Sequence, residues 1–136
     1  MKNIVLVIVC LLFIRNKCFG QDKPLVYRAF SYAIDIYDKI TQKYENGISK
    51  NVDILIFLTV DKIQIMDDGH DEFYIKQSMP VENKNGLTIY PFICYDKTET
   101  ECIVAFSYNE KGKYLVITYA KDFKISYNLR LISDGK

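Results

Sequence analysis

Strict alternation of apolar and polar residues marks the last long segment of the chain as a strand. In FKISYNLRL, residues 123–131, the apolar positions are 123, 125, 127, 129 and 131, and every residue between them is polar. Side chains of a strand point to opposite faces with a period of two. The pattern therefore predicts a strand with one buried face, formed by Phe123, Ile125, Tyr127, Leu129 and Leu131.

Two further segments are apolar on both faces and rich in β-branched residues, DILIFLTV at 53–60 and YLVITYA at 114–120. Such runs are typical of strands that are covered on both sides. Ile54, Ile56 and Leu58 are therefore predicted to belong to the core.

The acidic stretch DDGHDE separates KIQIM from FYIK, and this arrangement predicts a hairpin. Pairing Ile63 with Ile75 and Ile65 with Phe73 keeps all four side chains on one face. A slip of one residue would reverse the faces of the whole strand, so this register is internally consistent.

The first apolar segment, residues 24–44, fits two periodicities, and ENGISKN at 45–51 reads as an internal turn after it. Propensity alone does not decide between helix and strand there. The helical stripe would contain Val26, Phe30, Ala33, Ile34, Tyr37, Ile40 and Tyr44, and the strand face would contain Val26, Phe30, Tyr32, Ile34 and Ile36.

Cys94 and Cys102 flank a turn-forming stretch, CYDKTETEC, whose centre is Thr98. If they lie opposite each other, Phe92 falls opposite Val104 and Tyr90 opposite Phe106, all on one face. Directly opposed residues come close enough for a disulfide, and the chain-entropy estimate for a loop of this length is roughly 2.5 kcal/mol. A disulfide is the favoured interpretation. A zinc site or a redox dithiol is one alternative, but only one histidine is present and the two cysteines lack the usual spacing. A pair of free thiols is the other alternative.

The acidic turn carries four carboxylates around a glycine. Such oxygen ligands suit Ca²⁺, although their spacing does not match the EF-hand loop. The simpler interpretation is a solvated hairpin turn that also contains His70. The residues of this alternative metal site are Asp67, Asp68, Asp71 and Glu72.

Aromatic residues are concentrated on the predicted strands, where they commonly fill a core. A subset could instead line a pocket for a small apolar or sugar-like ligand. The candidates for such a lining are Tyr90, Phe92, Phe106 and Tyr108.

The amino-terminal residues have the three-part layout of a secretory signal, with Lys2, an apolar run over 4–14, and small residues before an expected cut near Gly20. The apolar run is shorter than the roughly 20 residues that a spanning helix needs. Residues 1–20 are therefore predicted to be a signal peptide and residues 21–136 a single β-rich domain, periplasmic or secreted, with no stable membrane span in its mature form.

Composition narrows the function further. The formal charge is +1, which gives no strong attraction to nucleic acid. No catalytic motif, phosphate loop or cofactor-binding motif is visible in the sequence. A catalytic residue, a cofactor and a nucleic-acid partner are therefore not expected.

Four stretches together resemble a known group of sequences: VYRAFSYAIDIYD, VDILIFLTVDKIQIMDD, YPFICYDKTETECIVAF and YLVITYAKDFKISYNLRLI. The chain is similar to uncharacterised small exported proteins of Gram-negative bacteria. These have a signal peptide, a first strand rich in Tyr and Phe, and a central F-x-C-x-D element followed by a second cysteine. Phe92, Cys94, Asp96 and Cys102 match that element. The resemblance implies an extended first segment, and it implies no particular activity.

These observations predict an all-β fold, an antiparallel meander of about eight strands that forms a small barrel or sandwich. An α+β fold with a helix at about 25–44 is the alternative. The expected function is a non-enzymatic exported binding domain, whose partner would be an envelope or extracellular protein. A small-molecule carrier with an aromatic-lined pocket and a Ca²⁺-dependent module are the other hypotheses.

Overall fold

The computed structural model describes residues 24–133, and every regular element in this part of the chain is a β-strand. The predicted signal peptide and its cleavage near Gly20 lie outside the described residues. Within those residues the structure contains no apolar helix of membrane-spanning length. The strands are β1 (Leu25–Asp38), β2 (Lys43–Leu58), β3 (Lys62–Met66), β4 (Asp71–Ser78), β5 (Glu82–Lys84), β6 (Leu87–Tyr95), β7 (Glu101–Asn109), β8 (Gly112–Tyr119) and β9 (Phe123–Ser133).

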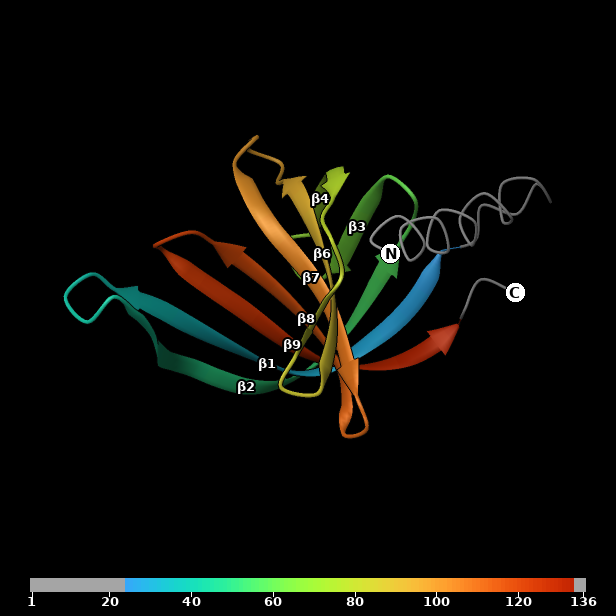
Figure 1. Cartoon of the computed structure of the whole chain (residues 1–136). Coiled ribbons are helices and arrows are strands. Elements are labelled where there is room, and N and C mark those ends of the chain that lie inside the picture. Colours follow the sequence, from blue (N-terminus) through green and yellow to red (C-terminus); the bar gives the residue numbers. More distant parts are fainter. Residues whose placement is uncertain (1–23, 134–136) are drawn as a thin grey trace.

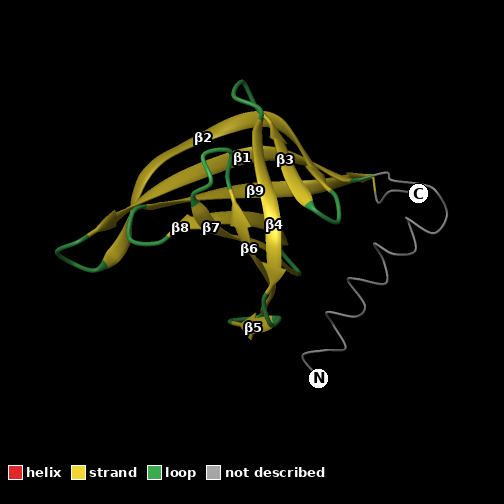
Figure 2. Ribbon diagram, turned by 90° about the horizontal axis from the view of Figure 1, so that it is seen from above, coloured by secondary structure: helices red, strands yellow, loops and turns green. Residues whose placement is uncertain are grey.

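The strands form one antiparallel sheet that closes into a barrel. Their order is β4-β3-β2-β1-β9-β8-β7-β6-β5, and β4 also pairs with β6. This extra pairing closes a ring of eight strands and leaves β5 as an added strand beside β6. Figures 1 and 2 show the curled sheet and the long β1–β2 hairpin that projects from it. The predicted all-β barrel is confirmed, and the helical alternative for the first segment is wrong.

The barrel interior is filled by apolar faces that alternation predicted, except that Leu131 of the predicted face on β9 is 39% exposed. Leu115 and Val104 are completely buried, and the predicted core residue Ile56 is too. Closing the ring buries the inward face of each strand and leaves no open edges around most of the barrel. The buried set is Ala29, Ile56, Leu58, Ile63, Ile65, Phe73, Phe92, Cys94, Cys102, Val104, Leu115, Ile117, Tyr127 and Leu129.

The turn between β1 and β2 lies earlier than the sequence suggested. ENGISKN, predicted to be a turn, is part of β2. The chain reverses instead at 39–42, where the Gln42 N–H donates to the Asp38 carbonyl at 2.8 Å and the Ile40 N–H donates to the Asp38 carboxylate at 2.7 Å. Asp38 therefore closes the turn with both its backbone and its side chain.

A bulge at Phe30 breaks the face that the sequence assigned to β1. Ala29 pairs with Leu129 and Ser31 with Asn128, so Phe30 is an extra residue without a partner. Tyr32 keeps an inward direction, but Phe30 is turned outward and is 47% exposed. The predicted common face of Phe30 and Tyr32 is wrong because one inserted residue reverses the alternation.

The hairpin of β3 and β4 has a register two residues away from the predicted one. Ile63 pairs with Phe73, and Ile65 pairs with Asp71. The turn is tight, with the His70 N–H donating to the Asp67 carbonyl at 3.2 Å, so pairing begins closer to the turn. Ile75 pairs with Cys94 of β6 instead and so takes part in closing the barrel.

Candidate functional site

The β1–β2 hairpin extends well beyond the strand that neighbours β2. Pairing between β2 and β3 is confined to Leu55–Leu58, whereas β2 pairs with β1 from Lys43 onward. We call residues 31–51 the arm. Figure 1 shows the turn of the arm at the far left, away from the loops of β3 and β4.

One face of the arm continues the inner face of the barrel. Tyr32 pairs with the buried Tyr127, and Ile34 pairs with both Ile125 and Ile48. Residues opposite each other in an antiparallel pair share a face. We call this face the inner wall, formed by Tyr32, Ile34, Ile36, Glu45, Ile48 and Lys50.

Large apolar side chains of the arm are in contact with solvent. Ile36 is 59% exposed and Ile48 is 62% exposed, both on the inner wall, and Ile40 at the turn is 93% exposed. Single exposed apolar residues are common on protein surfaces, but a contiguous group of them marks a surface that can bind a partner. Ile36 and Ile48, on neighbouring pairs of the inner wall, form such a group.

The free edge of the arm is interrupted in two places. Along β2 the residue Gly47 has no partner on β1, and a second irregularity leaves Val52 and Asp53 outside the ladder. Bulges and charged residues such as Lys50 are devices that prevent strand addition at an edge. The inner wall, and not the strand edge, is therefore the part of the arm suited to docking.

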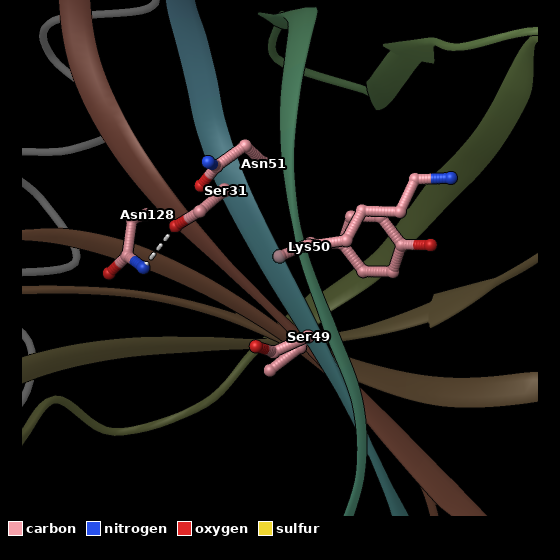
Figure 3. A pocket seen from close by; sticks show the side chains of 7 residues that line it. Ser31, Ser49, Lys50, Asn51 and Asn128 are labelled. Atoms are coloured by element: carbon pink, nitrogen blue, oxygen red, sulfur yellow. Dashed lines mark hydrogen bonds between the residues drawn. The ribbon is translucent and has the colours of Figure 1, made fainter.

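The outer face carries a hollow of about 490 Å³ at the root of the arm. Ser31, Asn51 and Asn128 gather on one side of the strands, whereas Lys50 lies on the other (Figure 3). The Asn128 side-chain amide donates to the Ser31 hydroxyl at 2.6 Å. The lining consists of Ser31, Tyr32 and Ala33 of β1, Ser49, Lys50 and Asn51 of β2, and Asn128 of β9.

The cysteine pair has the predicted register. Cys94 lies directly opposite Cys102, and the pairs Phe92–Val104 and Tyr90–Phe106 follow as expected. Cys94 and Cys102 are buried and are free thiols in this structure, so the disulfide itself stays a prediction. Burial, reinforced by the neighbouring Cys102 thiol, raises the pKa of Cys94 to about 12. The thiols are therefore protonated at neutral pH, which does not favour nucleophilic or metal-binding chemistry.

Asp96 joins the turn after β6 to the end of β8. Its carboxylate accepts hydrogen bonds from the Thr98 N–H at 2.9 Å, the Thr100 N–H at 2.9 Å and the Tyr119 hydroxyl at 2.8 Å. Burial acts to raise the pKa of Asp96, but these hydrogen bonds outweigh it and lower the pKa. The first cause of the raised pKa of Tyr119 is burial, and the bond to Asp96 adds to it. The arrangement closes a turn.

The acidic turn does not bring its four carboxylates together. The pKa of Asp71 is raised by burial and then by the charge of the neighbouring Asp67. Glu72 is directed elsewhere, accepting from the Gln64 amide at 3.0 Å and the Tyr74 hydroxyl at 2.6 Å. Asp68 is exposed. Within residues 24–133 no three His, Cys, Asp or Glu side chains are arranged to hold a metal ion.

The proposed aromatic lining residues pack against their neighbours. Phe92 is in the core, and Phe106 lies 5.7 Å from Tyr27 between ring centroids. Tyr90 stacks on Tyr108 at 6.2 Å, and Tyr108 is half exposed. The hollow described above involves none of these residues, and its lining on β1 comes from the middle of the strand, residues 31–33.

Sequence reasoning missed both the arm and the hollow. The polar composition of 45–51 resembles a turn, because an exposed strand without a core partner loses the alternation that marks buried strands. The only sequence signal for the hollow is the placing of Ser and Asn at polar positions of strands, such as Asn128 within FKISYNLRL.

Comparisons with known proteins found no match: no family model, no curated protein and no solved structure is significantly similar to the chain.

Proposed function

We propose that this protein is a non-enzymatic, exported binding domain, and that the inner wall of the arm is the surface that contacts a partner protein. The observation that carries the proposal is the exposure of Ile36 and Ile48, at 59% and 62%, on a face that is buried elsewhere in the barrel. The barrel supplies a rigid support, and the arm presents an apolar surface from it.

The composition of the inner wall favours a protein partner over a small molecule. Glu45 pairs with Ile36, and Lys50 pairs with Tyr32, so charges of both signs border the isoleucines. An apolar centre with a polar, charged border is the usual anatomy of a protein interface. The fitting partner presents a few apolar side chains to the isoleucines, with an acidic group near Lys50 and a basic group near Glu45.

The chemically perturbed groups support a non-enzymatic role. Burial is the first cause of the raised pKa of Cys94, Cys102 and Tyr127. The pKa of Asp96 is lowered, against the effect of burial, by the hydrogen bonds with which its carboxylate closes a turn. Such shifts accompany folding, whereas a catalytic group must also meet a substrate in a cleft.

The export part of the proposal is supported by the signal-peptide pattern at the amino terminus of the sequence.

Site-specific photo-crosslinking tests the proposal. A photoreactive amino acid would replace Ile48 on the inner wall in cells that naturally produce the protein, and Ser49 on the outer face would be the matched control. These positions are consecutive in β2 but point to opposite faces. We expect a discrete protein adduct from position 48 and none from position 49. The same adduct from both positions, or none from position 48, would contradict an inner-wall interface.

A further inference from the structure

We infer that the hollow at the root of the arm is a binding site for a neutral saccharide. The hollow measures about 490 Å³, within the range typical of small-molecule sites. Tyr32 and Lys50 of the inner wall border the hollow, but its hydrogen-bonding groups on the outer face, Ser31, Asn51 and Asn128, do not belong to the proposed protein contact. The hollow lies next to the irregularity at which Phe30 of β1 and residues 52–53 of β2 are left out of the ladder.

The hydrogen-bonding groups of the hollow are held in place and have capacity left. The Ser31 hydroxyl oxygen accepts a hydrogen bond from the Asn128 side-chain amide, with 2.6 Å between the two atoms. The hydroxyl proton of Ser31 is therefore free to donate to a ligand. Asn128 retains its carbonyl oxygen and a second N–H. Asn51 and Ser49 make no side-chain hydrogen bond to another residue of the described chain. Together these groups offer both donors and acceptors, as the hydroxyl groups of a sugar require.

The residues of the hollow are poor choices for a strand on structural grounds alone. Asn is depleted in strands, yet Asn51 and Asn128 lie on β2 and β9, each directly paired with Ser31 of β1. On β9 the inward side next to Asn128 follows the expected apolar pattern, with Tyr127 and Leu129 both buried. Asparagines that depart from strand preference on the outer face alone, and that add nothing to the packing of the core, point to a functional role at that place.

The charge of the hollow favours an uncharged ligand. Lys50 is the single charged residue among those that line it, and it lies on the other side of the strands from Ser31, Asn51 and Asn128 (Figure 3). The groups on the outer side are amides and hydroxyls.

Titration monitored by NMR tests this inference. The ¹⁵N-labelled protein would be titrated with maltotriose and with triacetylchitotriose, each up to about 10 mM, since millimolar Kd values are typical of weak sites. We expect saturable shifts of the Asn51 and Asn128 side-chain amide signals with at least one of the two sugars. The absence of saturable shifts with both sugars would overturn the proposal.

Two variants distinguish sugar binding in the hollow from non-specific contact of the sugar with the protein surface. Asn51→Ala should weaken binding about tenfold, because it removes hydrogen bonds to the ligand. Asn46→Ala, which changes an asparagine of β2 outside the hollow, is the matched control and should bind as the unchanged protein does. Asn51 is exposed, so its replacement leaves the folded spectrum intact. Equal binding by Asn51→Ala, or shifts confined to the inner wall, would refute a site in the hollow.

Discussion

Cys94 on β6 lies directly opposite Cys102 on β7, and both side chains are buried inside the closed barrel. Opposed residues of an antiparallel pair have Cα separations of about 4.5–5.5 Å, a distance that a disulfide can span. The pair therefore already has the backbone geometry of a cross-link, although its thiols are free in this structure.

Mild oxidation of the folded protein should join these two cysteines. Burial raises the pKa of Cys102 to about 11 and that of Cys94 to about 12, so spontaneous exchange at neutral pH is slow. Once formed, the bond should raise the free energy of unfolding by about 2 kcal/mol. Peptide mapping by mass spectrometry would identify the bond, and urea unfolding would measure its effect. Oxidation that yields only intermolecular products would contradict the paired geometry.

Removal of the Tyr119 hydroxyl should make stability less dependent on acid pH. Folding lowers the pKa of Asp96, so its ionised form stabilises the fold above its ordinary pKa of about 4, and this contribution is lost as pH falls through the folded-state pKa. Tyr119→Phe removes one of the hydrogen bonds responsible. It should cost about 1 kcal/mol at pH 7 and less near pH 3.

Urea unfolding at both pH values would measure this effect. Tyr114→Phe on the same strand is the matched control, because the Tyr114 hydroxyl makes no hydrogen bond to another described residue. A loss of stability in Tyr119→Phe that is equal at pH 7 and pH 3 would show that Asp96 is not the partner that matters.

Alternation in the sequence predicted the strands that face the core, and it failed where strands are irregular or exposed. The face of Tyr127 and Leu129 was evident because each inward position is apolar and each outward one polar. The bulge at Phe30 could not be predicted, because an unpaired residue is defined by its neighbours in space. The exposed strand around Ile48 lacks a buried face, so its polar residues look like a turn.

Gly47 should be necessary for the β2 bulge between the Ile34–Ile48 and Asp35–Asn46 pairs. A Cβ atom at this position would lie 2.6 Å from the carbonyl oxygen of Ile34, which is a backbone atom and cannot rotate away. Gly47→Ala should therefore lower the free energy for opening the arm by about 1–3 kcal/mol. Amide hydrogen exchange of the arm would show this as faster exchange at Ile34 and its neighbours.

Gly69→Ala is the control for the Gly47 variant. The nearest atoms to a Cβ at Gly69 belong to the side chains of Asp67 and Asp71, at 3.6 and 3.7 Å, which is ordinary contact. This variant should leave exchange in the arm unchanged. Equal exchange in Gly47→Ala and the unchanged protein would mean that the bulge can shift to accept a side chain.

Two isoleucines of β2 should differ sharply in their contribution to stability. Ile56 is completely buried, whereas Ile48 on the same face is 62% exposed. Ile56→Ala leaves a cavity in the barrel and should cost about 2–5 kcal/mol. Ile48→Ala should change stability by no more than about 0.5 kcal/mol, as is usual for exposed positions. Urea unfolding would measure the free energy of unfolding of both variants, provided that the m-values stay equal.

A large loss of stability in Ile48→Ala would place this residue in the folding core and would remove the reason to regard the inner wall as a binding surface. A negligible loss would leave an exposed isoleucine that folding does not require, which is what a docking surface predicts.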